Sequence, residues 1–224
     1  GRGWVAGVSI AVSPGERVYV PLRHPESENL DPDRVTRWLR ALVETAPAVA
    51  FSAPAHAALI RGTVQVSATA SDSQGISRVE FFDGETLIDT ATSAPYTVSW
   101  DTTGSPNGGR TLWARAYDLA GNVQEAWRSV NVDNAAPSVA ITAPAGGAKI
   151  FLSTTIKATA SDNNAVTQVV FYYGNTVIGT DTTPPYSVGW GTLFVPRGQH
   201  TLTAKAYDSA GNVTTSAGVV VTVQ

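Results

Sequence analysis

Acidic residues placed at turn positions are the residues in this sequence best suited to chemistry. An aspartate ends each Ala-Thr-Ala-Ser-Asp run and each Ala-Tyr-Asp run, and an Asp-Asn pair stands between the two halves. Carboxylate and amide oxygens are hard ligands, and Ca²⁺ takes about six to eight of them. The same carboxylates can instead close Asx turns, as the Asp-x-Ala-Gly-Asn pattern invites. The candidate calcium ligands are Asp72, Asp118, Asp133, Asn134, Asp162 and Asp208.

Residues for catalysis are scarce. The chain has no cysteine, which excludes disulfides, thiolate metal sites and cysteine nucleophiles. Its three histidines, His24, His56 and His200, form no metal-type pair, and no Gly-x-Ser-x-Gly elbow or phosphate loop occurs. We therefore expect exposed histidines, no catalytic residue, no required cofactor and no enzyme activity, with Ca²⁺ as the one ion to consider.

Composition points to folded all-β modules. Of 224 residues, 43% are hydrophobic and 15% charged, and the net charge is −3 without a basic block. Binding to nucleic acid is therefore not expected. Apolar runs stay below the roughly 18 residues that span a bilayer, so membrane insertion is not expected either.

An internal repeat divides the chain. The segment APAVAFSAPA returns as APSVAITAPA, and TLWARAYDLAGNV returns as TLTAKAYDSAGNV, each 90 positions later. The two copies align from 46–134 to 136–224 without a gap. A unit of about 90 residues matches a self-contained sandwich domain rather than a solenoid repeat.

Each copy is predicted to consist of short strands separated by turns. In the strand at 110–117, Leu112, Ala114 and Ala116 would face inward, and the second copy keeps these residue types. Val79 and Phe81 would be buried by the same alternation. The predicted strands of the first copy are 48–52, 62–70, 76–83, 86–90, 96–100, 110–117 and 123–132.

The repeated pattern resembles a known family. Val79-Glu80-Phe81, Pro95-Tyr96, Trp100 and Ala116-Tyr117-Asp118, followed by Ala120-Gly121-Asn122, resemble the bacterial Ig-like domains appended to secreted enzymes, adhesins and phage structural proteins. The resemblance implies an all-β fold of two tandem immunoglobulin-like Greek-key β-sandwiches, domain 1 over 46–134 and domain 2 over 135–224.

That topology would bring acidic loops together. The loop after the second strand of the second copy carries Asp162, and the loop before its last strand carries Asp208. Both would lie at the end of the sandwich where the linker Asp133-Asn134 enters. Oxygens from three segments could therefore converge on a Ca²⁺ that stiffens the pair.

Aromatic residues supply a second candidate surface. Phe82, Trp113 and Tyr117 would project from the outer face of one sheet, and Trp127 is replaced by Ala217 in the second copy. Exposed rings can stack on sugar faces or anchor a protein partner. The alternative is that they pack against the N-terminal hairpin and helix, which need an apolar partner.

The first 45 residues do not belong to the repeat. Trp4–Val12 and Arg17–Leu22 predict a β-hairpin, and Asp31-Pro32 predicts the start of a helix. This ββα segment resembles part of the 3′–5′ exonuclease domain of DNA polymerase I-type enzymes. None of that family's metal ligands is carried over, so no nuclease site is expected.

The functional hypotheses come from different classes. The first is a structural or adhesive module that acts as a spacer or binding surface on a secreted, cell-surface or virion protein. The alternative is a carbohydrate-binding accessory module of a secreted enzyme, and the third is a remnant of a polymerase exonuclease domain. The expected partners are protein or carbohydrate surfaces.

Overall fold

The computed structural model describes residues 7–13, 16–21 and 46–224. In the first part, β1 (Gly7–Ser13) pairs antiparallel with β2 (Glu16–Pro21), so the predicted hairpin is present. The helix predicted from Asp31 onward and His24 lie outside the described residues.

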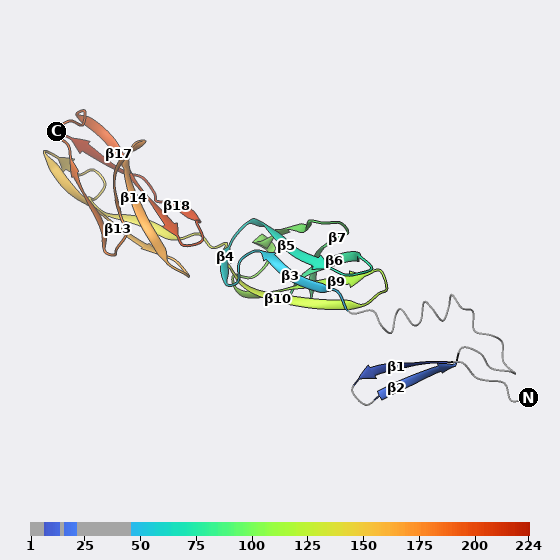
Figure 1. Cartoon of the computed structure of the whole chain (residues 1–224). Helices are drawn as coiled ribbons and strands as arrows, with labels where there is room; N and C mark the ends of the chain where they lie inside the picture. Colours follow the sequence, from blue (N-terminus) through green and yellow to red (C-terminus); the bar gives the residue numbers. More distant parts are fainter. Residues whose placement is uncertain (1–6, 14–15, 22–45) are drawn as a thin grey trace, which may run out of the picture.

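The first copy is a sandwich of two sheets (Figure 1). One sheet has the order β3-β5-β8, with β3 at Ala48–Ala53, β5 at Thr63–Ser71 and β8 at Tyr96–Asp101. The other has the order β4-β10-β9-β6-β7. Its strands are β4 (Ala58–Ile60), β6 (Ile76–Asp83), β7 (Thr86–Ala91), β9 (Gly108–Asp118) and β10 (Val123–Val132).

The second copy repeats this arrangement. Its smaller sheet has the order β11-β13-β16, with β11 at Ser138–Ala143, β13 at Ser153–Ser161 and β16 at Tyr186–Gly191. Its larger sheet has the order β12-β19-β17-β14-β15, and β18 also pairs with β17. These strands are β12 (Lys149–Ile150), β14 (Val166–Tyr173), β15 (Thr176–Asp181), β17 (Gly198–Asp208), β18 (Val213–Thr215) and β19 (Val219–Val223).

Seven strands of the first copy lie where they were predicted, and β4 is an eighth. It is three residues long and pairs in parallel with the end of β10. Such a short strand carries no usable alternation, which is why the sequence pattern missed it. The turn from β6 to β7 begins at Gly84, whose φ of +59° favours glycine.

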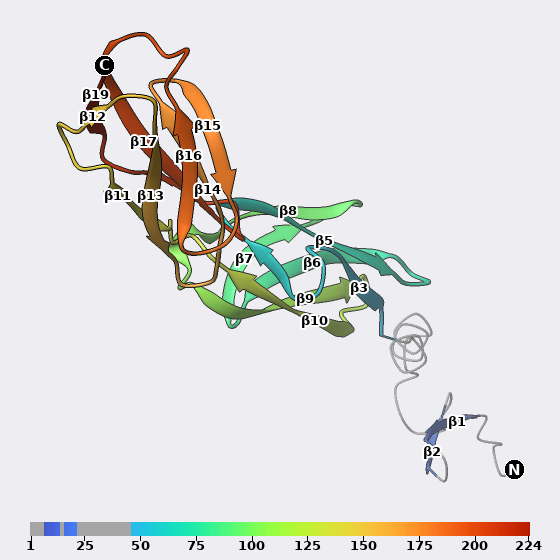
Figure 2. The same cartoon turned by 90° about the vertical axis from the view of Figure 1, so that its left-hand side faces the viewer.

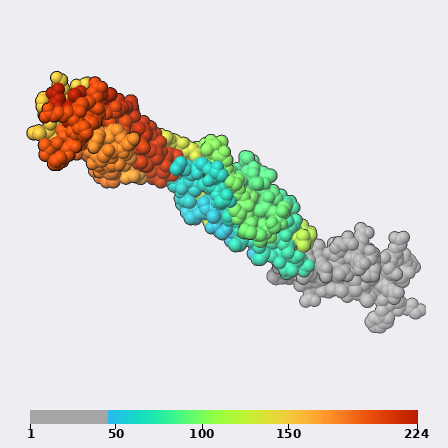
Figure 3. Space-filling model, turned by 90° about the horizontal axis from the view of Figure 1, so that it is seen from above, coloured from blue at the N-terminus to red at the C-terminus, as the bar shows by residue number. Residues whose placement is uncertain are grey.

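Each sandwich encloses its own hydrophobic core. Val79, Phe81, Leu112, Ala114 and Ala116 are fully buried in the first copy, as the alternation predicted. The equivalent residues of the second copy form a separate cluster around Phe171 and Leu202. The two sandwiches lie end to end, as Figures 2 and 3 show. Among the residues that the structure describes, no helix is long and apolar enough to cross a membrane.

The last strand distinguishes the two copies. At the start of this strand the copies agree, since Arg115 pairs with Glu125 and Lys205 pairs with Thr215, 90 positions later. Further along they differ. Leu112 pairs with Arg128, but Leu202 pairs with Val219, one residue later than the repeat requires. The extra residue lies between β18 and β19. There Ser216 turns inward, donates its N–H to the Ala204 carbonyl oxygen over 2.8 Å, and accepts from the Ala204 N–H over 3.0 Å.

Candidate functional sites

The linker between the sandwiches holds Asn134 against the first copy. The Asn134 Nδ2 donates to the Thr102 carbonyl oxygen over 3.0 Å, and its Oδ1 accepts from the Gly62 N–H over 2.8 Å. The Asn134 N–H donates to Asn107 Oδ1 over 2.8 Å. Thr102 is fully buried, at the start of the 3-10 turn Thr102–Gly104 that follows β8. The amide side chain therefore closes the end of the first sandwich.

The preceding residue, Asp133, is held by the second copy. Its side chain is fully buried, and Oδ1 accepts from Asn163 Nδ2 over 3.1 Å while Oδ2 accepts from Asn164 Nδ2 over 2.5 Å. Asn212 Nδ2 donates to the carbonyl oxygens of Asp133 and Ala135, each over 2.9 Å. The side chains of successive linker residues are thus bonded to opposite domains, while the Asp133 N–H donates to the Ile60 carbonyl oxygen of the first copy over 2.9 Å.

A further contact crosses the junction outside the linker. Arg61, next to Gly62 at the end of the first copy, donates from Nε to the Ala210 carbonyl oxygen over 2.9 Å. Ala210 lies in the loop between β17 and β18 of the second copy. This exposed bond adds a lateral restraint between the domains.

Three carboxylates meet at this junction, as the topology predicted. Each of Asp133, Asp162 and Asp208 offers one oxygen, and these oxygens lie within 4.8 Å of one another. The three residues come from the linker, the loop after β13 and the end of β17. This donor set suits a hard divalent cation such as Ca²⁺.

The other predicted ligands lie elsewhere. Asp72 and Asp118 lie at the opposite end of the first copy from Asp133, and Asp72 Oδ1 accepts from the Gln74 N–H over 2.8 Å in an Asx turn. Asn134 directs its side-chain amide onto the first copy, as described above. Within the described residues, only Asp133, Asp162 and Asp208 form an acidic group of this kind.

Asp118 organises the loop that follows β9. Its Oδ1 accepts from the Gly121 and Asn122 N–H groups over 2.7 and 2.8 Å, and its Oδ2 accepts from Asn122 Nδ2 over 2.7 Å. Burial by itself would raise the pKa of Asp118, but the hydrogen bonds from Asn122 and Gly121 outweigh it, so the pKa lies below its usual value.

The outer face of the five-stranded sheet carries an apolar row. Phe82 pairs with Leu87 on one side and with Trp113 on the other, and Trp113 pairs with Trp127. Directly paired residues lie on the same face of a sheet. The row Leu87–Phe82–Trp113–Trp127 therefore crosses four neighbouring strands, and Leu87 and Trp127 are 51% and 60% exposed.

Charged groups flank this aromatic row. The Arg115 guanidinium lies 4.5 Å from the Phe82 ring centroid and pairs with Glu125 over 2.6 Å. Arg78 lies 3.6 Å from the centroid of Tyr117, the fourth predicted surface residue. The second copy has Tyr172 and Thr203 in place of Phe82 and Trp113, so the tryptophan pair is specific to the first copy.

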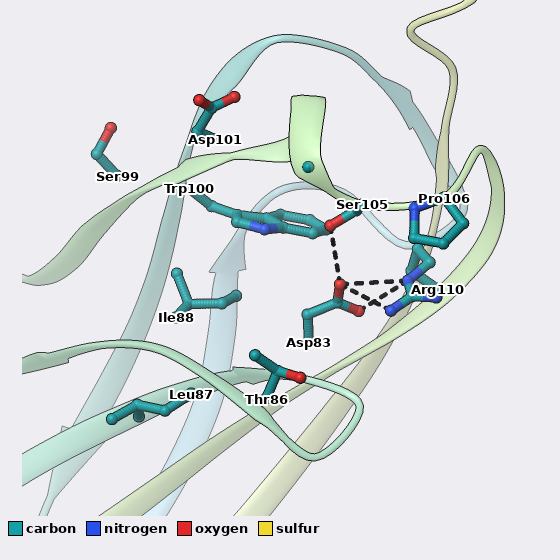
Figure 4. Close-up of a pocket in the computed structure, with 11 residues that line it drawn as sticks. Asp83, Thr86, Leu87, Ile88, Ser99, Trp100, Asp101, Ser105, Pro106 and Arg110 are labelled. Carbon is teal, nitrogen blue, oxygen red and sulfur yellow. Dashed lines mark hydrogen bonds and ion pairs between the residues drawn. The ribbon is translucent and has the colours of Figure 1, made fainter.

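A hollow of 430 Å³ lies on the first copy near the β6–β7 turn (Figure 4). Its polar wall holds Asp83, whose buried carboxylate accepts from Arg110 Nε over 2.9 Å, from Arg110 Nη2 over 2.9 Å and from Ser105 Oγ over 3.1 Å. The hydrogen bond to Asp83 raises the pKa of Arg110. Because the charge of this carboxylate is balanced by the Arg110 guanidinium, we assign the ion pair a structural role.

The second copy replaces this ion pair with an aromatic cluster. Tyr173 and His200 stand at the positions of Asp83 and Arg110, and the His200 ring lies 5.8 Å from Tyr173 and 6.3 Å from Trp190. His200 is therefore half-buried, and the expectation that it is exposed was wrong. His56 is exposed beside Trp127, with ring centroids 5.9 Å apart.

A sandwich of two sheets with this strand order defines the immunoglobulin and fibronectin type III class of β-modules. A family model described as Bacterial Ig domain matches residues 47–114 and 137–204. The chain belongs to the bacterial Ig domain family, with two tandem copies.

One solved structure supports this fold. Fibronectin(III)-like modules of CbhA from Clostridium thermocellum are 30% identical to this chain with a TM-score of 0.52, and the match covers 79% of this chain and 93% of theirs. An endo-beta-1,4-mannanase from Thermotoga petrophila is 16% identical with a TM-score of 0.37, over 52% of this chain and 28% of its own. Comparison with curated proteins gives no match. Nothing found supports the resemblance of the N-terminal segment to an exonuclease.

The lowered pKa of Asp118 gives a pH-dependent contribution to stability. A carboxylate with a lowered pKa in the folded state stabilises the protein above its unfolded pKa, and this contribution is lost as the pH falls through the folded value. We expect Asp118→Asn to lower the Tm of the first domain by roughly 5 °C at neutral pH, with the difference disappearing in acid. Calorimetry across pH 2 to 7 measures this, with the exposed Glu85→Gln as the control. A difference that persists unchanged in acid would contradict it.

Proposed function

We propose that this chain is a non-catalytic structural module in which two Ig-like domains form a spacer of defined geometry on a secreted, cell-surface or virion protein. The observation that carries the proposal is that the side chains of two successive linker residues are bonded to different domains. The Asp133 side chain is bonded to the second domain, and the Asn134 side chain is bonded to the first.

This arrangement limits rotation between the domains. A flexible linker needs side chains and peptide groups that are solvated in many conformations. Here the buried Asp133 carboxylate accepts from two amides of the second domain, while the Asp133 N–H donates to the Ile60 carbonyl oxygen of the first domain over 2.9 Å. A rotation about the linker would therefore break hydrogen bonds to one domain or the other. Arg61 restrains the same rotation from the side. A spacer of this kind sets the distance and direction of whatever it connects.

The spacer function predicts that both domains align as one body in solution. Residual dipolar couplings of the unmodified chain should fit a single alignment tensor over 46–224. Asn134→Ala combined with Asn212→Ala removes the Asn134 side-chain bonds to the first domain and the Asn212 bonds to the linker carbonyls. The two domains should then require separate tensors. Asn122→Ala, at the repeat position equivalent to Asn212, is the control, because it lies at the far end of the first domain. Separate tensors in the unmodified chain would contradict the proposal.

We further propose that Ca²⁺ reinforces this junction through Asp133, Asp162 and Asp208. Three carboxylates within 4.8 Å repel one another, and a divalent cation between them would offset that repulsion. Two of the three, Asp133 and Asp208, are buried, which strengthens their mutual electrostatic interaction. The bound ion would join the linker to two loops of the second domain.

Calcium binding predicts a stabilisation that depends on these carboxylates. At a free Ca²⁺ concentration of 100 times Kd, the free energy of unfolding should rise by about 2.7 kcal/mol, and a chelator should reverse the accompanying rise in Tm. Asp162→Asn should abolish the response, whereas Asp72→Asn, its repeat equivalent, should leave it intact. A melting curve of the unmodified chain that responds to neither Ca²⁺ nor chelator would contradict the proposed Ca²⁺ site.

A second function is favoured by the apolar row on the first domain. Trp113 and Trp127 are paired on neighbouring strands, with Phe82 continuing the row, and aromatic side chains can stack on the apolar faces of neutral sugars. The flanking Arg115, Glu80 and Glu125 provide groups that can donate to or accept from hydroxyls. We propose that this face binds a polysaccharide chain.

Polysaccharide binding predicts a strict dependence on the tryptophan pair. In pull-down assays with insoluble cellulose, chitin and mannan, Trp113→Ala should weaken binding to the preferred polymer about tenfold, equivalent to about 1.4 kcal/mol. Tyr172→Ala on the equivalent face of the second domain is the control and should bind normally. Failure of the unmodified chain to bind any of these polymers would remove this second function and leave the spacer function untouched.

A further inference from the structure

An apolar patch covers the far end of the second domain. Phe151 and Leu152 lie in the turn between β12 and β13, and Leu193 and Phe194 lie in the loop between β16 and β17. The exposed fractions of these four side chains run from 66% to 94%. The two loops are joined, because the Thr192 N–H donates to the Leu152 carbonyl oxygen over 2.8 Å. These four residues are called the distal patch.

The repeat shows what such a position does in the first domain. The equivalents of the distal patch are Arg61, Gly62, Thr103 and Gly104, and these loops lie at the junction. Arg61 bonds to Ala210 of the following domain, and Gly62 bonds to the linker. This end of the sandwich is therefore a docking end in the first copy, where it receives the loop end of another Ig-like domain.

Arg61 and a residue beside its partner differ between the copies, while the partner Ala210 itself corresponds to Ala120. Arg61 becomes Phe151 in the second copy, while Ser209, beside the Ala210 that Arg61 contacts, corresponds to Leu119 in the first copy. Leu119 is 69% exposed on the loop end of the first domain, where its N–H donates to the Gly75 carbonyl oxygen. A polar docking end thus matches a polar loop end within the chain. An apolar docking end is matched by an apolar loop end at the opposite extremity.

Charge supports the same pairing. The distal patch is flanked by the exposed Lys149 and Arg197, and residues 145–154 and 189–200 contain no acidic residue. The loop end around Leu119 carries Asp72. Two distal patches facing each other would bring like charges together, whereas a distal patch on a loop end would bring opposite charges together.

From this complementarity we propose that the distal patch docks on the Leu119 end of a second copy of this chain. The contact is head-to-tail, so it does not close into a dimer and lets chains add end to end. It repeats the geometry of the internal junction without a covalent linker. Because the ends of the sandwiches are small, the association is weak and depends on concentration.

Sedimentation velocity of the full chain, from low to high micromolar concentration, tests the proposal. The weight-average sedimentation coefficient should rise with concentration. Phe151→Ser combined with Phe194→Ser should abolish the rise, and Leu119→Ser alone should abolish it equally. Trp127→Ser, which changes an equally exposed apolar side chain away from both ends, should behave as the unmodified chain. All of these side chains are exposed, so folding should be retained, which circular dichroism checks.

Three outcomes would overturn the proposal. A coefficient that stays constant in the unmodified chain would show that the ends do not associate. Loss of association in the Phe151 and Phe194 variant but not in Leu119→Ser would mean that two distal patches meet. Co-sedimentation with phosphatidylcholine and phosphatidylglycerol vesicles that depends on the distal patch, without self-association, would assign the patch to a lipid surface instead.

Discussion

Every strand of these sandwiches must divide its side chains between a dry interior and an outer face, and this constraint governs the rest of the molecule. The interior positions of β9 hold Leu112, Ala114 and Ala116, which are fully buried. The alternate positions have no access to the core. Recognition is therefore confined to two kinds of surface, which are the outer faces of the sheets and the loops at the two ends.

The duplication separates what the fold requires from what each copy adds. Both copies keep a buried tryptophan, Trp100 or Trp190, and an aspartate, Asp118 or Asp208, that closes the loop after the long strand. The ion pair of the first copy between the buried Asp83 and the partly exposed Arg110 is replaced in the second by Tyr173 and His200, which pack together. Since both solutions close the same corner, the ion pair is one way of filling that space rather than a condition of the fold.

The internal junction and the contact proposed between chains use the same arrangement of domain ends. A docking end of one sandwich meets a loop end of the next, and the residues at the contact are matched in polarity. Within the chain the match is polar and includes the buried Asp133 and the bonded Asn134. In the contact proposed between chains it is apolar, with Phe151 on one domain and Leu119 on the other. The three carboxylates that we propose as a Ca²⁺ site lie at the internal junction.

The amino-acid sequence determined the duplication, the strands and the inner and outer faces, because a period of two and a repeat of 90 positions are local properties of the chain. It also indicated that Asp133, Asp162 and Asp208 converge. Only the tertiary structure decided that the Asn134 side chain bonds to the first domain rather than joining the three carboxylates. It also decided that Asp83 pairs with Arg110, and that one extra residue displaces the last strand of the second copy. Those features depend on strand register and on the directions of individual side chains, which contacts between distant segments fix and sequence spacing does not.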